Sequence, residues 1–240
     1  SFVSSLGADT MIGGDGIDTL DYSQSNAGVN VNLVTGEGQG GHAEGDIVSG
    51  FEMITGSAYS DTIIGTSANE TIIGGAGADY MDAGEGIDSI SYIASNAGVN
   101  VNLTTGEASG GHAQGDTVLG FEQLTGSNYN DTITGSEQND TIDGGSGNDY
   151  IYGSAGADSL LGGAGNDTLD YSGSSAAVNV SLLNSRGYGG DAEGDSISGF
   201  EALVGSSYND TLVGASTNDT IMGGAGDDYI DGGNGNDSLV

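Results

Sequence analysis

The sequence contains no cysteine, no proline, no tryptophan and no lysine, and its only basic side chain is Arg186. The lack of cysteine excludes disulfide bonds and thiolate metal sites. The lack of lysine excludes phosphate-binding loops and Schiff-base chemistry, which both require that side chain. Nucleic acids and anionic membranes attract basic patches, so neither is expected as a partner. No apolar run reaches transmembrane length, and the first residues do not resemble a signal peptide.

What the chain has in excess is acid and glycine. Asp and Glu number 35, which leaves a formal charge of -34 over 240 residues, and glycine supplies 48 positions. Such a chain normally stays disordered, because like charges oppose collapse and little apolar surface is available to bury. We therefore expect disorder unless something neutralises the acids. Divalent cations are the first candidates, because the acids recur at a fixed spacing.

A nine-residue repeat fills four runs, at residues 4–21, 56–91, 126–170 and 205–240. Its fullest form is GGxGxD, with an aliphatic residue two positions after the acid. Glycine allows positive φ in a turn, and the residues around the aliphatic position suit a short strand. Each nonapeptide thus predicts one turn and one strand. The repeated acids are Asp9, Asp18, Asp61, Glu70, Asp79, Asp88, Asp131, Asp140, Asp149, Asp158, Asp167, Asp210, Asp219, Asp228 and Asp237.

Two nonapeptides should form one coil of a flattened helix, so that acids two nonapeptides apart lie about one strand spacing, ~4.8 Å, from each other. Unpaired carboxylates at that distance repel, and a hard cation between them reverses the sign of the interaction. Calcium fits best, since it takes about six to eight oxygen ligands in irregular geometry. Zinc and copper would favour histidine or cysteine. The only histidines, His42 and His112, are expected to be exposed turn residues, because the third copy of their segment has Asp191 there.

The tandem GGxGxD pattern resembles the RTX (repeats-in-toxin) hemolysin-type calcium-binding repeat. The resemblance implies an all-β, right-handed parallel β-roll, or β-solenoid, with calcium ions between its turns. It also implies the ligands. One turn supplies its acid and the carbonyls of its second and fourth residues, and the turn one coil later supplies its acid and the carbonyls of its first and third residues.

Carried onto this chain, the resemblance places one ion among Gly145, Gly147, Asp149, Gly162, Ala164 and Asp167. Another would use Ser136, Gln138, Asp140, Gly153, Ala155 and Asp158. At least seven ions are expected, because seven pairs of acids are separated by two nonapeptides: Asp61/Asp79, Glu70/Asp88, Asp131/Asp149, Asp140/Asp158, Asp149/Asp167, Asp210/Asp228 and Asp219/Asp237. Further turn residues assigned to metal sites are Gly14, Gly16, Gly75, Gly77, Gly144, Ser146, Gly156, Gly223, Ala225, Gly232 and Asn234.

Some positions depart from this scheme. Asp9 and Asp18 are included as metal residues, although neither has a partner in nonapeptide register. The longer arm of Glu70 is expected to weaken or reshape its site. Tyr59, Tyr129 and Tyr208 replace the fourth glycine of their turns, and we expect them to cap the ends of runs rather than to recognise a ligand.

A 46-residue block occurs three times without insertion, from Leu20, Ile90 and Leu169, and its spacer segments lie within 20–56, 90–126 and 169–205. The distance along the chain from the second block start to the third is one nonapeptide longer than the distance from the first to the second. We therefore expect one continuous solenoid over 1–240. Leu20 and the next flanking aliphatic, Ile54, are separated by two positions fewer than four nonapeptides, which suggests roughly two wider coils. Phe51, Phe121 and Phe200 should fill their core.

Acids also recur inside the blocks. Asp46, Asp116 and Asp195 stand at a glycine-rich turn, and Glu52, Glu122 and Glu201 follow the phenylalanines. Either a further calcium or a solvated acidic turn fits these positions. Tyr22, Tyr92 and Tyr171 are expected to pack where each run passes into its block.

No known catalytic motif is present, so we expect this segment not to be an enzyme. The favoured function is a calcium-binding module of a secreted bacterial protein, disordered without calcium and folding outside the cell as a secretion and structural scaffold. The resemblance adds type I export, and the chain is expected to be part of a larger protein. The alternative is a calcium-dependent adhesive or glycan-binding segment of a large extracellular adhesin, which would bind a cell surface or polysaccharide through the spacer blocks.

Overall fold

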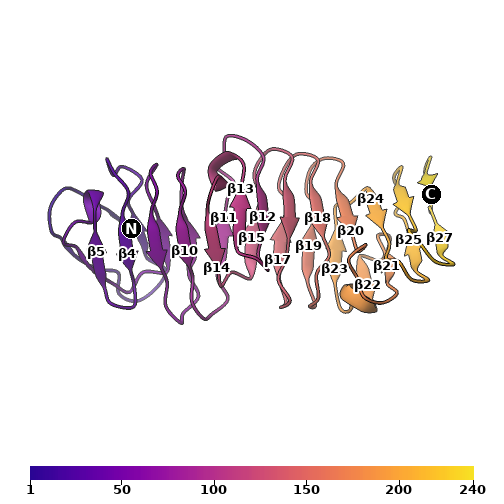
Figure 1. Cartoon of the computed structure of the whole chain (residues 1–240), viewed down its shortest axis with the longest axis horizontal. Helices are drawn as coiled ribbons and strands as arrows, with labels where there is room; N and C mark the ends of the chain where they lie inside the picture. The colour runs from indigo at the N-terminus through magenta and orange to yellow at the C-terminus, as the bar shows by residue number, and fades with distance from the viewer. The chain divides into compact units, whose positions relative to one another are not determined.

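The computed structural model describes all 240 residues as two compact units, Ser1–Thr125 and Gly126–Val240. Each unit consists of two sheets of short, mainly parallel strands, most of them three residues long (Figure 1). Along a nonapeptide run the chain alternates between the two sheets, with one turn at each crossing. The all-β class and the β-roll predicted from the repeats are thereby confirmed.

In each unit, the sheet that contains the spacer hairpins is here named the hairpin sheet, and the other the plain sheet. In the first unit the plain sheet has the order β1 (Phe2–Val3), β3 (Thr19–Asp21), β7 (Met53–Thr55), β9 (Thr71–Ile73), β11 (Ser89–Ser91), β15 (Gln123–Thr125). Its hairpin sheet has the order β2 (Thr10–Ile12), β6 (Ile47–Ser49), β5 (Glu37–Gln39), β4 (Asn30–Asn32), β8 (Thr62–Ile64), β10 (Tyr80–Asp82), β14 (Thr117–Leu119), β13 (Glu107–Ser109), β12 (Asn100–Asn102).

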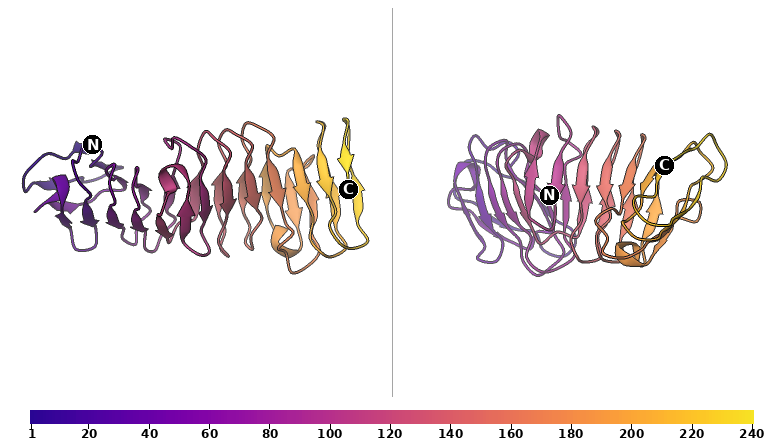
Figure 2. Two further views of the ribbon diagram at one scale, coloured as in Figure 1. Left: turned by 45° about the horizontal axis from the view of Figure 1, so that its top comes forward. Right: turned by 45° about the vertical axis from the view of Figure 1, so that its right-hand side comes forward.

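The second unit is built in the same way, and its successive strands lie side by side in all views (Figures 1 and 2). Its hairpin sheet has the order β17 (Thr141–Asp143), β19 (Ser159–Leu161), β23 (Ser196–Ser198), β22 (Arg186–Tyr188), β21 (Asn179–Ser181), β25 (Thr211–Val213), β27 (Tyr229–Asp231). Its plain sheet has the order β16 (Thr132–Thr134), β18 (Tyr150–Tyr152), β20 (Thr168–Asp170), β24 (Ala202–Val204), β26 (Thr220–Met222), β28 (Ser238–Leu239).

One coil of a nonapeptide run takes two nonapeptides, as the sequence predicted. Ile63 of β8 pairs with Met81 of β10, and Ile133 of β16 pairs with Ile151 of β18. Because side chains alternate across a strand, the middle residue of each three-residue strand points inward and its neighbours point outward. Apart from Ile230 of β27, which is half-buried, the inward residues of these strands are almost fully buried, and together they form a thin apolar core between the two sheets.

Each spacer block forms one enlarged coil, so the prediction of two wider coils is wrong. Leu20 of β3 pairs directly with Ile54 of β7, which makes the whole stretch between them a single circuit. The additional residues are taken up sideways, because β4, β5 and β6 all lie in the hairpin sheet between β2 and β8. Strand β5 runs antiparallel to both of its neighbours.

The spacer coil has a thicker core than the nonapeptide coil. In the first block Leu20, Tyr22, Val31 and Phe51 belong to one buried cluster. Phe51, Phe121 and Phe200 are only 3–4% exposed, which confirms their predicted core position. Three short 3-10 helices follow the hairpins: η1 (Gly41–Ala43), η2 (Gly111–Ala113) and η3 (Gly190–Ala192). His42 and His112 lie on the first two helices and are half-buried, so they are less exposed than the turn residues that the sequence predicted.

Candidate metal centre

The acids of the nonapeptide runs form ladders in which each acid contacts the acid one coil further along. The amide of Asp61 donates to Oδ1 of Asp79 over 2.9 Å, and the amide of Asp149 donates to Oδ1 of Asp167 over 2.8 Å. All seven acid pairs predicted from the two-nonapeptide spacing are joined in this way, with N···O distances from 2.6 to 3.0 Å. The turns therefore bring the backbone of one acid against the carboxylate of the next acid in every predicted pair.

The turns are of two kinds, which differ in whether a protein group donates a hydrogen bond to the second carboxylate oxygen. In a turn that begins Gly-Ser, the turn itself supplies the donors: Ser57 donates its amide to Oδ2 of Asp61 over 2.5 Å and its hydroxyl to Oδ1 over 2.8 Å. In the glycine-rich turns the corresponding oxygen has no such donor. Four acids leave Oδ2 buried without a hydrogen-bond partner: Asp79, Asp88, Asp149 and Asp167. Each of the four is the downstream acid of a predicted pair.

The carboxylate oxygens without a donor lie near main-chain carbonyl oxygens. The space between them stays open because the turn residue beside it is glycine, without a Cβ. A Cβ at Gly86 would lie 2.5 Å from the carbonyl oxygen of Ala68, one coil earlier, and 3.0 Å from Oδ2 of Asp88. Gly86 has a φ of +146°, a conformation that side chains other than glycine rarely adopt. The carbonyl and the carboxylate thus converge on one small oxygen-lined space. Oxygen-only ligands at irregular angles are the donor set that calcium prefers.

Burial makes these carboxylates hard to ionise without a cation. Desolvation raises the pKa of Asp79, Asp149 and Asp158 to about 7, and the neighbouring acids of the ladder add to the increase. The pKa of Asp88 rises to about 6 for the same reasons, with Glu70 and Glu122 as the acids that contribute. A positive charge beside these groups would favour the ionised form instead.

The spacer acids continue the same ladders, a connection that the sequence reasoning missed. The amide of Asp9 donates to Oδ1 of Asp46 over 2.8 Å, and the amide of Asp18 donates to Oε2 of Glu52 over 2.9 Å. Asp9 and Asp18 therefore do have acidic neighbours. The other blocks repeat both contacts, in the pairs Asp79/Asp116, Asp88/Glu122, Asp158/Asp195 and Asp167/Glu201. A search at the nonapeptide spacing could not find them, whereas the interval from Leu20 to Ile54 equals the interval from Asp18 to Glu52.

The aspartates of the spacer blocks have protein donors on both oxygens. Oδ2 of Asp46 accepts the hydroxyl of buried Tyr22 over 3.0 Å. The corresponding bonds are 2.9 Å for Tyr92 to Asp116 and 2.5 Å for Tyr171 to Asp195. The three tyrosines pack where each run enters its block, as predicted. Each hydroxyl donates to the second carboxylate oxygen, which has no donor in the glycine-rich turns.

Two carboxylates alone do not make a metal site. No three His, Cys, Asp or Glu side chains converge on a point that could hold a metal. A cation between the turns would thus need main-chain carbonyls as well. Such carbonyls are close by, because a Cβ at Gly163 would overlap the oxygen of Gly145, and a Cβ at Gly165 would overlap the oxygen of Gly147.

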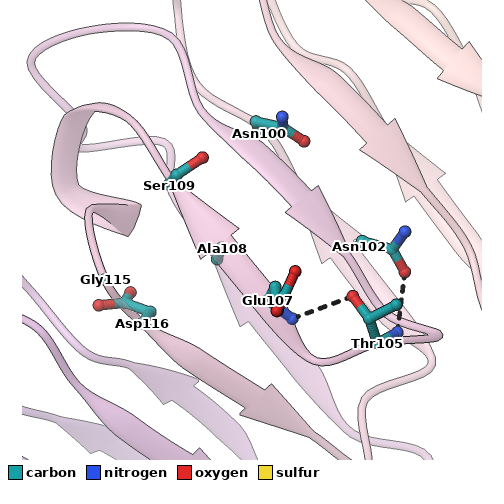
Figure 3. Close-up of a pocket in the computed structure, with 8 residues that line it drawn as sticks. All are labelled: Asn100, Asn102, Thr105, Glu107, Ala108, Ser109, Gly115 and Asp116. Carbon is teal, nitrogen blue, oxygen red and sulfur yellow. Dashed lines mark hydrogen bonds between the residues drawn. The ribbon is translucent and has the colours of Figure 1, made fainter.

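The surface of the second spacer hairpin has a polar hollow of about 510 Å³, lined by side chains of β12 and β13 (Figure 3). Oδ1 of Asn102 accepts the amide of Thr105, and the Thr105 hydroxyl accepts the amide of Glu107, so these side chains stabilise the hairpin turn itself. No aromatic ring lines the hollow. Tyr59, Tyr129 and Tyr208 lie elsewhere with 46–50% of their surface exposed, and their capping role stays a prediction. No helix is both long and apolar enough to cross a bilayer.

Comparison with known families agrees with the geometry of the turns. The model for the RTX calcium-binding nonapeptide repeat (four copies) matches residues 4–21, 55–90, 116–151, 144–173 and 204–239, which is more than half of the chain. The matched segments contain all seven acid pairs. No curated protein matches the chain. Repeats of this kind bind calcium, are typical of secreted bacterial proteins, and are not catalytic by themselves.

Proposed function

We propose that this chain, which belongs to the family of RTX calcium-binding nonapeptide repeats, is a module whose runs fold only when calcium binds. The calcium ions would lie between the acids of successive coils. The observation that carries this proposal is the set of buried oxygens without a donor on Asp79, Asp88, Asp149 and Asp167. An unsatisfied buried carboxylate is costly, and a cation shared with turn carbonyls removes that cost.

The proposed sites follow the seven acid pairs. In the five-repeat run, Asp149 and Asp167 would hold one ion with the carbonyls of Gly145, Gly147 and the turn that begins at Gly162. Asp149 also belongs to the pair with Asp131, so it would serve two ions. In the site of Glu70 and Asp88, the amide of Thr66 donates to Glu70 over 3.1 Å and the Thr66 hydroxyl donates to it as well, as Ser57 does to Asp61. The spacer acids Asp46, Asp116 and Asp195 are not assigned an ion, since each is the downstream acid of its pair and accepts a buried tyrosine hydroxyl on its second oxygen.

Coupling to folding follows from the charge. At -34, with only Arg186 as a base, the metal-free chain repels itself. The ligands are assembled only in the folded coil, so binding free energy contributes directly to folding. We propose that the chain leaves the cell unfolded through a type I channel and folds where calcium is plentiful, as a secretion and structural scaffold within a larger protein.

Circular dichroism during a calcium titration tests the proposal, starting from the full chain in excess chelator. We expect a disordered spectrum that converts to a β spectrum as calcium is added, while magnesium at the same concentration produces little change because it prefers strict octahedral geometry. Atomic absorption on the equilibrated protein should give about seven ions per chain. A β-rich chain in excess chelator would refute the proposal.

A further inference from the structure

At the entry to each spacer coil, protein groups donate to both oxygens of the spacer aspartate. In the third block, Oδ1 of Asp195 accepts the amide of Asp158 over 2.9 Å, and Oδ2 accepts the hydroxyl of Tyr171 over 2.5 Å. Asp195 and Tyr171 are both fully buried. The ring of Tyr171 lies against the preceding turn, since a Cβ at Gly153 would overlap it. At the same level of the ladder in a glycine-rich turn, Oδ2 has no donor at all.

At the exit from the spacer coil, protein groups also donate to both oxygens of an aspartate. The amide of Val178 donates to Oδ1 of Asp210 over 2.8 Å, while the amide and hydroxyl of Ser206 donate to the same carboxylate over 2.6 and 2.7 Å. In the first block, Val29 and Ser57 make the matching bonds to Asp61. Asp195 at the entry and Asp210 at the exit therefore have protein donors on both oxygens, so an ion at the exit would depend on the next acid, Asp228.

The interior of the spacer coil adds apolar burial that a nonapeptide coil lacks. A nonapeptide coil contributes two inward aliphatic side chains. The first spacer coil places Tyr22, Val29, Val31, Val48 and Phe51 in one buried cluster. Apolar burial stabilises a fold independently of any ion.

We propose that a spacer block, together with the Gly-Ser turn that follows it, is a nucleus of the fold that needs much less calcium than the nonapeptide runs. The segments that lie within a single unit are 20–61 and 169–210. Each nucleus keeps its structure at calcium concentrations at which the nonapeptide runs have opened, and the runs rebuild from it when calcium returns. This inference rests on the proposed function and assigns most of the metal dependence to the runs.

Hydrogen–deuterium exchange of the full chain, followed by mass spectrometry along a series of calcium–chelator buffers, tests the order of opening. We expect peptides from 20–61 and 169–210 to lose protection at a free calcium concentration at least about tenfold lower than peptides from 132–150 and 219–240. Loss of protection at one common calcium concentration would overturn the inference and leave the proposed function standing. Protection everywhere in excess chelator would overturn both.

The variant Tyr171→Phe tests the tyrosine hydrogen bond, because it keeps the ring against Gly153 and removes only the hydroxyl. We expect protection in 169–210 to fall about tenfold at low calcium, with the first block unchanged as an internal reference. Tyr229→Phe, at an exposed tyrosine of the same unit, is the matched control and should change nothing. A Tyr171→Phe chain that folds in saturating calcium and opens in the wild-type order would refute the role of the hydroxyl.

Discussion

The nonapeptide runs and the spacer blocks solve the same electrostatic problem by different chemistry. Both stack acids between coils, and in both the amide of one acid donates to the next. In the glycine-rich turns the remaining oxygen of Asp79 or Asp149 has no protein donor, whereas in the spacer blocks a tyrosine hydroxyl donates to it. The difference teaches that an acid ladder does not in itself require a metal at every level. The two kinds of turn differ in whether a buried hydroxyl donates to the second carboxylate oxygen.

The two solutions also differ in the length of chain that they need. A nonapeptide coil closes after two repeats, since its turns need only glycines, carbonyls and acids. The spacer coil from β3 to β7 is almost twice as long, because it must include a hairpin, a tyrosine and a larger apolar core. Binding an ion therefore permits a short coil with a thin core, and a coil that needs less calcium is longer.

The largest effect that would sharpen this comparison is expected from Asp149→Ala. Asp149 belongs to two acid pairs of the five-repeat run, so its loss should remove about two ions and, at calcium concentrations near a hundred times Kd, on the order of 5 kcal/mol of stability. Isothermal titration calorimetry and denaturant unfolding in calcium measure both quantities. Asp227→Ala is the matched control, because Asp227 is exposed and outside the ladder. An unchanged ion count in the Asp149 variant would contradict the assignment.

A smaller effect is expected from Gly165→Ala in a run, compared with Gly173→Ala in a spacer block. At Gly165, φ is +156° and an added methyl would overlap the carbonyl oxygen of Gly147, whereas at Gly173 nothing lies within 4 Å. We expect about 3 kcal/mol of destabilisation and weaker calcium binding for Gly165→Ala. Gly173→Ala should change stability by less than about 1 kcal/mol. The free energy of unfolding in calcium is measured with urea. An equal loss at the two positions would contradict the idea that only the turns of the runs are too tight for a side chain.

The smallest effect is expected from low pH, because protonation of the buried carboxylates should partly replace calcium. The pKa of Asp79, Asp149 and Asp158 is raised to about 7 in the metal-free fold, above the ordinary value of 3.8. A raised folded pKa means that protonation stabilises the fold fully below about pH 4, and that this contribution is lost as pH rises through about 7. In excess chelator, the β signal in circular dichroism should therefore be stronger at pH 5 than at pH 8. A chelated chain that is more ordered at pH 8 would contradict this linkage.

Much of the fold could be predicted from the sequence because the repeat is explicit. The nine-residue period predicts a turn and a strand, and the spacing of Ile63 and Met81 predicts the two-nonapeptide coil that the strand pairing shows. The same spacing predicts which acids meet, such as Asp140 and Asp158. These predictions are local, and a periodic chain repeats each local decision many times.

The spacer blocks were harder to predict, because their length is compatible with several paths. The stretch from Leu20 to Ile54 fits two irregular coils as well as one coil with a sideways hairpin, and only strand pairing distinguishes them. The partners of Asp9 and Asp18 depend on that path, so they could not be found from nonapeptide spacing. The bond from Tyr22 to Asp46 joins residues at a separation that is not a multiple of the nonapeptide.

Because the strands of a run alternate between two sheets, an odd or an even number of repeats decides which sheet contains the next hairpin. The run from β8 to β11 has four strands, and the hairpin β12–β13 that follows it lies in the sheet of the first strand, β8. The run from β16 to β20 has five, and its hairpin β21–β22 lies in the sheet opposite to β16. Gain or loss of one nonapeptide therefore moves the next hairpin to the other face of its unit without changing any residue of the hairpin. Repeat number alone can thus redistribute surface features in an array of this kind.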